Sequence, residues 1–106
     1  SSATLAFVLR YGQPYFVDER SFSEARGEPN KCITNAAIEA LNFPARTYVE
    51  GYFMLPGYQT YHHAWTASPE GALHEQTLTE QYRPIAYYGV PFTADYVRHS
   101  ILENER

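Results

Sequence analysis

Two strong turn signals divide the middle of the chain into three short segments with strand character. The turns are Pro56-Gly57 and Ser68-Pro69-Glu70-Gly71, and the segments that they separate are residues 46–55, 62–67 and 72–77. Proline and glycine favour tight turns, and strands joined by so few residues run antiparallel. Side chains of the first segment also alternate in character, as they do in a strand. The sequence therefore predicts a small antiparallel sheet.

A helix is predicted directly before this sheet. Asn30 is a good N-cap residue, and the segment Asn42-Phe43-Pro44 ends the helix because a residue before proline is pushed out of the helical region. Cys32 then lies in the first turn, where unpaired N–H groups and the helix dipole favour an anion and lower a thiol pKa. The apolar stripe of this helix is formed by Ile33, Ala37, Ala40 and Leu41.

The two ends of the chain show shorter patterns. Residues 5–11 and 15–17 are apolar and β-prone, so we expect two short strands there, or one strand and an extended segment. Residues 18–30 are predicted to form a polar loop. Residues 81–92 contain prolines and a glycine, which favours an irregular or edge segment, and Thr93 caps a final predicted helix.

Length and composition bound the class of protein. With 106 residues, 44% of them apolar and 19% charged, we expect one compact α+β domain over residues 1–106, with the Cys32 helix packed on the sheet. The net charge is −4 and the eight basic residues are scattered, so we expect no nucleic-acid partner. No apolar run approaches the roughly 20 residues of a membrane span, and the first residues do not resemble a secretory signal. We therefore expect no membrane partner and a cytoplasmic location. No Gly-rich phosphate loop is present, so we expect no cofactor.

Cys32, His63 and Glu75 are the candidate catalytic residues. A thiol attacks a carbonyl well only as a thiolate, so it needs a neighbouring imidazole, and the imidazole needs an acceptor that fixes its tautomer. Adjacent strand side chains point to opposite faces, so only one of His62 and His63 can face the helix. Each candidate also has a simpler interpretation. Cys32 can be a small buried residue, His63 a structural histidine and Glu75 an exposed strand carboxylate.

A metal site is the weaker interpretation of these residues. His62 with His63, and His74 with Glu75, are adjacent strand residues whose side chains diverge, so neither pair can hold one ion. The three candidate residues have suitable ligand types, but acyl transfer explains them equally well. We therefore expect no metal, and we expect His62, His74 and His99 at the surface or at loop edges.

Several short motifs, taken in order and with their spacing, resemble the core of the transglutaminase-like superfamily, which is papain-like in its Cys-His-acid site. In that family a Cys opens a helix, a Pro-Ala-Arg-like run leads into a strand with Gly-Tyr, His-Ala-Trp follows in a strand, and an acid comes next. The acid is usually Asp followed by Pro, whereas this chain has Glu75 followed by Gln76. The motifs here are Cys32-Ile33-Thr34-Asn35-Ala36-Ala37, Phe43-Pro44-Ala45-Arg46-Thr47-Tyr48-Val49-Glu50-Gly51-Tyr52, His63-Ala64-Trp65 and Leu73-His74-Glu75-Gln76-Thr77.

The resemblance implies a triad with Cys32 as nucleophile, His63 as general base and acid, and Glu75 as the residue that orients His63. The implied activity is acyl transfer on an amide of a protein or peptide through a thioester, of hydrolase type: protease, amidase or deamidase. One alternative is a transamidating, transglutaminase-type acyltransferase. Another is a non-catalytic protein-binding module or effector that keeps the fold. A solvent-reachable Cys32 beside His63 favours the enzyme, and a buried Cys32 that points away favours the module.

Overall fold

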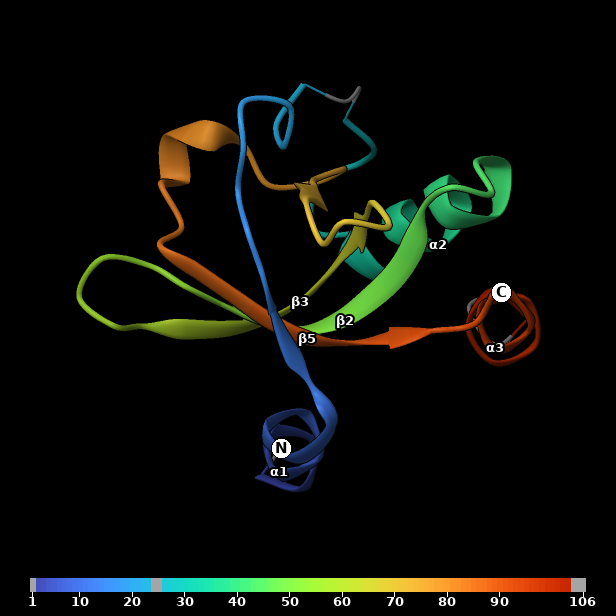
Figure 1. Ribbon diagram of the computed structural model, residues 1–106, viewed down its shortest axis with the longest axis horizontal. Coiled ribbons are helices and arrows are strands. Elements are labelled where there is room, and N and C mark those ends of the chain that lie inside the picture. The colour runs from blue at the N-terminus through green and yellow to red at the C-terminus, as the bar shows by residue number, and fades with distance from the viewer. Residues whose placement is uncertain (1, 24–25, 104–106) are drawn as a thin grey trace.

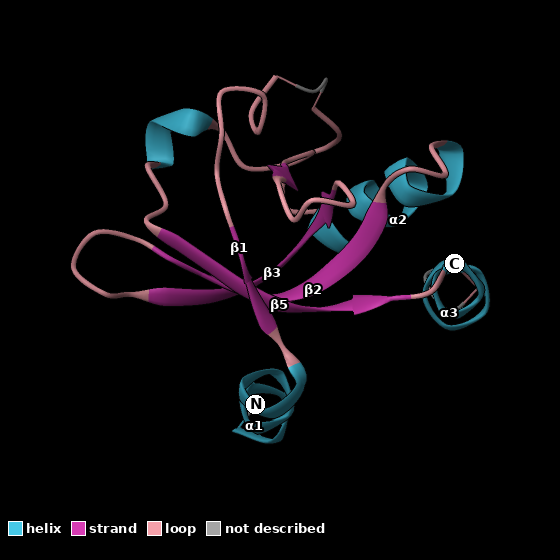
Figure 2. Ribbon diagram, in the orientation of Figure 1, coloured by secondary structure: helices cyan, strands magenta, loops and turns pink. Residues whose placement is uncertain are grey.

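Within residues 2–23 and 26–103, which the computed structural model describes, five strands form one antiparallel sheet (Figure 1). Across the sheet their order is β1 (Gln13–Tyr15), β5 (Ala86–Phe92), β2 (Thr47–Met54), β3 (Thr60–Ala67) and β4 (Leu73–His74). The helical elements are α1 (Ser2–Tyr11), α2 (Cys32–Asn42), the 3₁₀ turn η1 (Glu80–Tyr82), and the short α3 (Ala94–Tyr96), which continues as the π-helix η2 (Val97–Leu102). Long loops connect β1 to α2 and β4 to β5 (Figure 2).

The sheet curls until its two edge strands meet at one end. The N–H of Phe16, just after β1, donates to the carbonyl oxygen of Gly71 at 3.2 Å, and the N–H of Leu73 in β4 donates to the carbonyl oxygen of Phe16 at 2.9 Å. These bonds join opposite edges, so the sheet has the form of a half-barrel. The predicted compact α+β class, with the Cys32 helix packed on an antiparallel sheet, is confirmed.

Apolar side chains are buried on both faces of the sheet. Alternation along β2 sends Val49 and Phe53 to the inner face of the curl and Tyr48 to the outer face, which α2 and η2 cover. The buried inner cluster consists of Tyr15, Val49, Phe53, Trp65, Ala67, Leu73 and Tyr87. The buried outer cluster consists of Ala36, Ala37, Ala40, Tyr48, Ala64, Val97 and Ile101.

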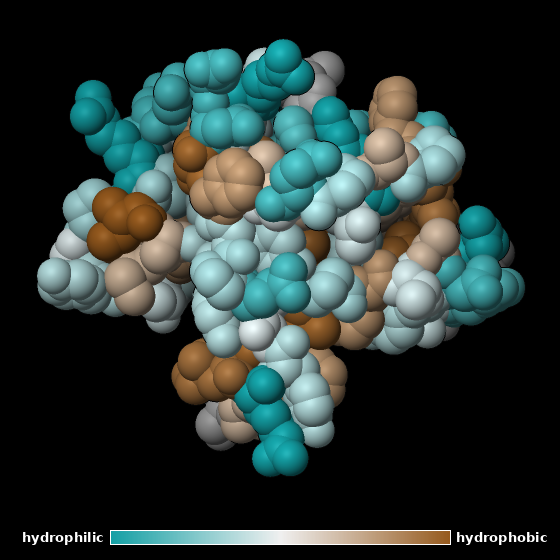
Figure 3. Space-filling view, viewed as in Figure 1, coloured by the Kyte–Doolittle hydropathy of each residue, from teal (hydrophilic) through white to brown (hydrophobic). Residues whose placement is uncertain are grey.

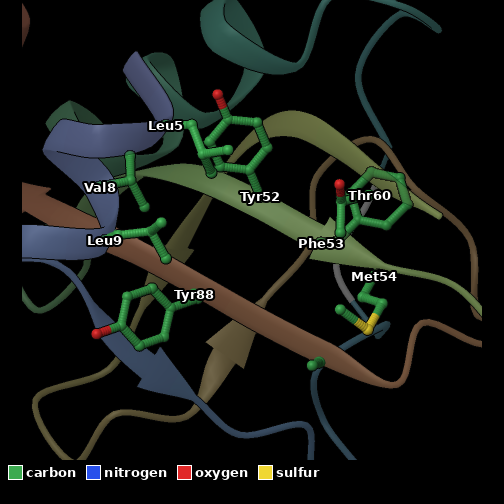
Figure 4. Close-up of a pocket in the computed structure, with 9 residues that line it drawn as sticks. Leu5, Val8, Leu9, Tyr52, Phe53, Met54, Thr60 and Tyr88 are labelled. Carbon is green, nitrogen blue, oxygen red and sulfur yellow. The ribbon is translucent and has the colours of Figure 1, made fainter. Parts of the chain in front are cut away.

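The prediction of a strand over residues 5–11 is wrong, because this segment belongs to helix α1. Leu5, Val8 and Leu9 recur at helical spacing, and Val8 packs against the sheet with 4% of its surface exposed. Tertiary packing thus determines the helical conformation of a segment whose local propensity favours a strand. An apolar pocket of about 150 Å³ lies between α1 and the sheet (Figure 4).

Much of the apolar surface of α1 remains exposed. Leu9 is 63% exposed, and other large apolar side chains of the helix are exposed to lesser degrees. Brown atoms in the region of α1 show this apolar surface in the space-filling view (Figure 3). None of the helices in the described ranges combines the length and the hydropathy that a bilayer crossing needs.

The prediction of an irregular or edge segment over residues 81–92 is wrong for its second half, because β5 lies between β1 and β2. β1 pairs only with residues Tyr87 to Gly89 of β5, so the side of β5 away from β2 is open at Pro91. A proline is tolerated at such a position because no neighbouring strand needs its missing N–H. Gly89 is required for a different reason. A Cβ at this position would lie 2.9 Å from the Trp65 ring and 2.8 Å from Val49. The missing side chain therefore lets Trp65 pack directly on β5.

Two predicted boundaries also shift. Asn30 is not the N-cap of α2, because it adopts the left-handed conformation with φ 63° and Lys31 caps the helix without a side-chain hydrogen bond. The predicted strand over residues 72–77 is reduced to β4, because the chain leaves the sheet after His74. Thr93 does cap the last helix as predicted, since its hydroxyl accepts the N–H of Tyr96 at 3.2 Å.

Candidate active site

Cys32 is the first residue of α2 and lies at the wall of a small recess. The recess has a volume of about 240 Å³ and is lined by residues 30–34. The left-handed turn at Asn30 directs the chain into the helix, and the thiol is partly exposed. The recess therefore opens beside the candidate nucleophile.

Asn35 holds the start of α2 against the rest of the site. Its Nδ2 atom donates to the carbonyl oxygen of Glu28 at 2.9 Å and to the hydroxyl of Thr77 at 2.8 Å. Thr77 follows two residues after Glu75, so one amide group joins the segment before Cys32 to the segment after the acid. Asn35 belongs to one of the motifs noted in the sequence. Its role was missed because no local pattern identifies Thr77 as its partner.

His63 lies on the inner face of β3, and only 5% of its surface is exposed. Its ring packs edge-on against Phe53, with centroids 4.9 Å apart, and stacks with Trp65 at 6.1 Å. β4 pairs only with the last two residues of β3, so the rest of that edge is open. There the backbone of Ala64 hydrogen-bonds to Cys32, and the imidazole of His63 interacts with the Cys32 side chain.

Glu75 is fully buried behind His63. Nε2 of His63 donates to Oε2 of Glu75 at 2.7 Å, and the N–H of Leu78 donates to Oε1 at 3.0 Å. The backbone N–H of Glu75 donates to the carbonyl oxygen of Ser21 at 2.8 Å, which fixes the residue as the chain leaves the sheet. With Nε2 engaged, Nδ1 is the ring nitrogen that remains for Cys32. The structure thus brings all three candidate residues together in the order Cys32, His63, Glu75.

The pKa shifts of Cys32 and His63 have the directions that favour a thiolate–imidazolium pair. Burial alone would raise the pKa of Cys32, but the hydrogen bond and charge of His63, with the backbone of Ala64, outweigh burial and the repulsion of Glu75, so the pKa is lowered. Burial would lower the pKa of His63, but its hydrogen bonds and charge interactions with Cys32 and Glu75 raise it to about 9. Both shifts favour the ionised forms of the pair at neutral pH.

Tyr87 is a fourth member of the group that the sequence analysis did not identify. Its hydroxyl donates to Oε2 of Glu75 at 2.8 Å, the same oxygen atom that accepts Nε2 of His63. Tyr87 is 2% exposed, and its ring contacts Trp65 edge-on with centroids 5.0 Å apart. Burial and the neighbouring Glu75 charge raise the pKa of Tyr87, which keeps the phenol protonated as a donor. The sequence does not reveal its position, because the prolines and glycine of residues 81–92 predict an irregular segment.

Replacing Tyr87 by Phe is expected to slow alkylation of Cys32 at about pH 6 by several-fold. The buried carboxylate of Glu75 would lose a donor that stabilises its charge, so the proton of His63 would shift toward Glu75 and the thiolate would lose its cation. Tyr15→Phe is the matched control, because Tyr15 is buried in the same cluster and pairs with Tyr87 across β1 and β5. Equal labelling rates in Tyr87→Phe, Tyr15→Phe and the wild type would contradict this role for Tyr87.

The remaining histidines lie apart from this group. His74 is buried, with 8% of its surface exposed, and lies at the loop edge where the chain leaves β4. His99 lies at the surface as expected, where it pairs with Glu103. His62 points to the outer face, where its Nε2 lies 3.0 Å from Oε2 of Glu50. In the described residues no group of three or more His, Cys, Asp or Glu side chains is arranged to hold a metal ion.

Comparisons of the chain with protein-family models, with curated proteins and with solved structures found no match.

Proposed function

We propose that this chain is a cysteine-dependent acyl-transfer enzyme of hydrolase type that acts on an amide of a protein or peptide. The observation that carries the proposal is the buried bond of 2.7 Å between His63 and Glu75, placed beside a partly exposed thiol of lowered pKa. A structural histidine or an inert buried cysteine would need neither the buried carboxylate nor the recess. The resemblance to the transglutaminase-like superfamily agrees with this function.

In the proposed reaction the Cys32 thiolate attacks the amide carbonyl, and a C–S bond forms as the C=O π electrons move to oxygen. The imidazolium of His63 then gives its proton to the amide nitrogen, the C–N bond breaks, and ammonia or an amine leaves. Neutral His63 next takes a proton from water, which attacks the thioester and releases the acid and the thiolate. Glu75 accepts from Nε2 throughout and holds Nδ1 toward the sulfur.

The start of α2 is the proposed oxyanion site. Lys31 caps the helix without a side-chain hydrogen bond, so no cap side chain competes for the first N–H groups of α2. Donors of this kind, held in place before the reaction, stabilise the negative oxygen of a tetrahedral intermediate. The left-handed turn at Asn30 precedes these groups, and residues 30–34 line the recess.

An activated ester tests this function without knowledge of the natural substrate. On mixing with p-nitrophenyl acetate, we expect a burst of nitrophenol equal to the amount of protein, and an acetyl group on Cys32 by intact mass. Cys32→Ala should show neither. Adding a primary amine separates the two enzyme alternatives: faster turnover with an N-acetyl product favours transamidation, and an unchanged rate favours hydrolysis. Absence of the burst in a protein whose Cys32 is readily alkylated would contradict acyl transfer and favour the binding module.

A further inference from the structure

A second hydrogen-bonded group occupies the outer face of the sheet, the face on which α2 lies. The hydroxyl of Tyr48 donates to Oε1 of Glu50 at 2.8 Å, and Nε2 of His62 lies 3.0 Å from Oε2 of the same residue. Tyr48 is 1% exposed, whereas the side chains of Glu50 and His62 are 26% and 40% exposed. The carboxylate of Glu50 is thus bonded to the buried Tyr48 on one side and is partly open to solvent on the other.

This group shares a neighbour, Ala64, with the candidate nucleophile. Glu50 is directly opposite Ala64 in the pairing of β2 with β3, and the backbone of Ala64 hydrogen-bonds to Cys32. Side chains that are directly opposite in an antiparallel pair have Cβ atoms roughly 5 Å apart. The buried cluster that contains Tyr48 and Ala64 also packs against Cys32. Glu50 is therefore the cross-strand neighbour of Ala64, the residue whose backbone bonds to Cys32.

Glu50 carries a negative charge that has no permanent cationic partner among the described residues. Its ion pair is with His62, whereas Arg46 and Arg98 pair with Glu39 and Asp95. Burial alone would raise the pKa of Glu50, but the hydrogen bonds from His62 and Tyr48, together with the charge of His62, outweigh burial and lower it. Two oxygen atoms offer about four acceptor positions, so the two bonds leave room for a further donor.

We propose that Glu50, held by Tyr48 and partly covered by His62, is the subsite that binds a cationic group of the substrate next to the amide attacked by Cys32. The substrate class would then be a peptide or protein segment with a Lys or Arg side chain near the reactive amide. A partly buried carboxylate is well suited to this role, because charge-assisted hydrogen bonds are stronger than neutral ones and burial reduces their screening. The inference rests on the proposed function, since it names the substrate of the same site.

Charged thiol reagents measure this subsite directly, because they carry a cation or an anion to Cys32. The rates with 2-aminoethyl methanethiosulfonate (cationic) and 2-sulfonatoethyl methanethiosulfonate (anionic) are each divided by the rate with methyl methanethiosulfonate (neutral). This division removes differences in thiol reactivity between variants. At low ionic strength we expect the wild type to prefer the cation, and Glu50→Gln to lower the cation-to-anion ratio by roughly threefold or more.

Two further variants make the test decisive. Glu39→Gln is the control, because it removes the same charge from α2 at a residue already paired with Arg46, and it should leave the ratio unchanged. His62→Ala uncovers Oε2 of Glu50 and should raise the ratio, and this variant decides the matter if Glu50→Gln does not fold.

Failure of the subsite and failure of the proposed function give different results. Fast reaction with the neutral reagent, but a ratio that neither Glu50→Gln nor His62→Ala changes, would overturn the subsite alone. Slow reaction of the wild type with the neutral reagent at about pH 6 would overturn the proposed function and the subsite with it.

Discussion

Replacing His63 by Ala is expected to lower the rate of acyl transfer to Cys32 by roughly 10²-fold or more. The variant removes the group whose hydrogen bond and charge lower the pKa of Cys32, while burial and the charge of Glu75 remain and raise it. The thiol would then be protonated at neutral pH, and no side chain would be placed to move the proton. The initial nitrophenol release from p-nitrophenyl acetate measures the rate, and ultraviolet absorbance of the thiolate measures the pKa.

His99→Ala provides the control for this prediction. His99 is an exposed histidine that pairs with Glu103 at 2.7 Å on the last helix, and its loss should change neither the burst nor the thiolate titration. A His63→Ala variant that folds and still shows the wild-type burst would remove His63 from the mechanism.

Replacing Glu75 by Gln is expected to cost roughly 10³-fold in acyl transfer. With its single oxygen in the place of Oε1, which accepts from the backbone N–H of Leu78, the amide would present its NH₂ group to Nε2 of His63 and to Tyr87. The imidazole ring would then carry its proton on Nδ1, toward Cys32. A histidine in that tautomer cannot accept a proton from the thiol. The same change replaces charge-assisted bonds in a fully buried position, so we also expect a loss of roughly 1–3 kcal/mol in the free energy of unfolding.

Urea unfolding measures the loss of stability in Glu75→Gln, and the nitrophenol burst measures its loss of acyl transfer. Glu75→Asp keeps the charge but retracts the carboxylate by one methylene, so its activity should fall between those of the wild type and Glu75→Gln. Glu39→Gln removes a carboxylate from a half-buried ion pair outside the site and should leave the burst unchanged. Wild-type activity in Glu75→Gln would show that Glu75 serves the fold and has no part in proton transfer.

The part of the fold nearest the site follows from local patterns. Alternation over residues 46–55, the two turns and the helical stripe after Cys32 predict β2, β3 and α2 to within about two residues, and they predict that His63 and Trp65 share a face. The mutual order of Cys32, His63 and Glu75 follows from the same segments. These elements are regular, and the spacing of apolar residues in each one shows which face is buried.

Other parts depend on contacts between distant segments and are not visible in local patterns. Helix α1 has strand-like propensity and is helical because Val8 packs on the sheet. β5 contains a proline and a glycine, and it becomes a central strand because β1 ends before Pro91 and Gly89 makes room for Trp65. Tyr87 belongs to β5, so its bond to Glu75 could not be anticipated while that strand was unrecognised.

The central claim, that His63 holds Cys32 as a thiolate, is tested most directly by alkylation with iodoacetamide at about pH 6. A free thiol with a pKa of about 8.5 is almost fully protonated there, whereas the lowered pKa of Cys32 should leave a larger fraction of it as thiolate. Because a thiolate of lower pKa is also a weaker nucleophile, we expect the net advantage over a free thiol to be roughly tenfold. Cys32 is the single cysteine of the chain, so total labelling reports this residue alone. The account predicts fast labelling of the native protein that His63→Ala slows to the free-thiol rate. Labelling that requires denaturation, or that follows ordinary free-thiol kinetics in the native protein, would contradict it.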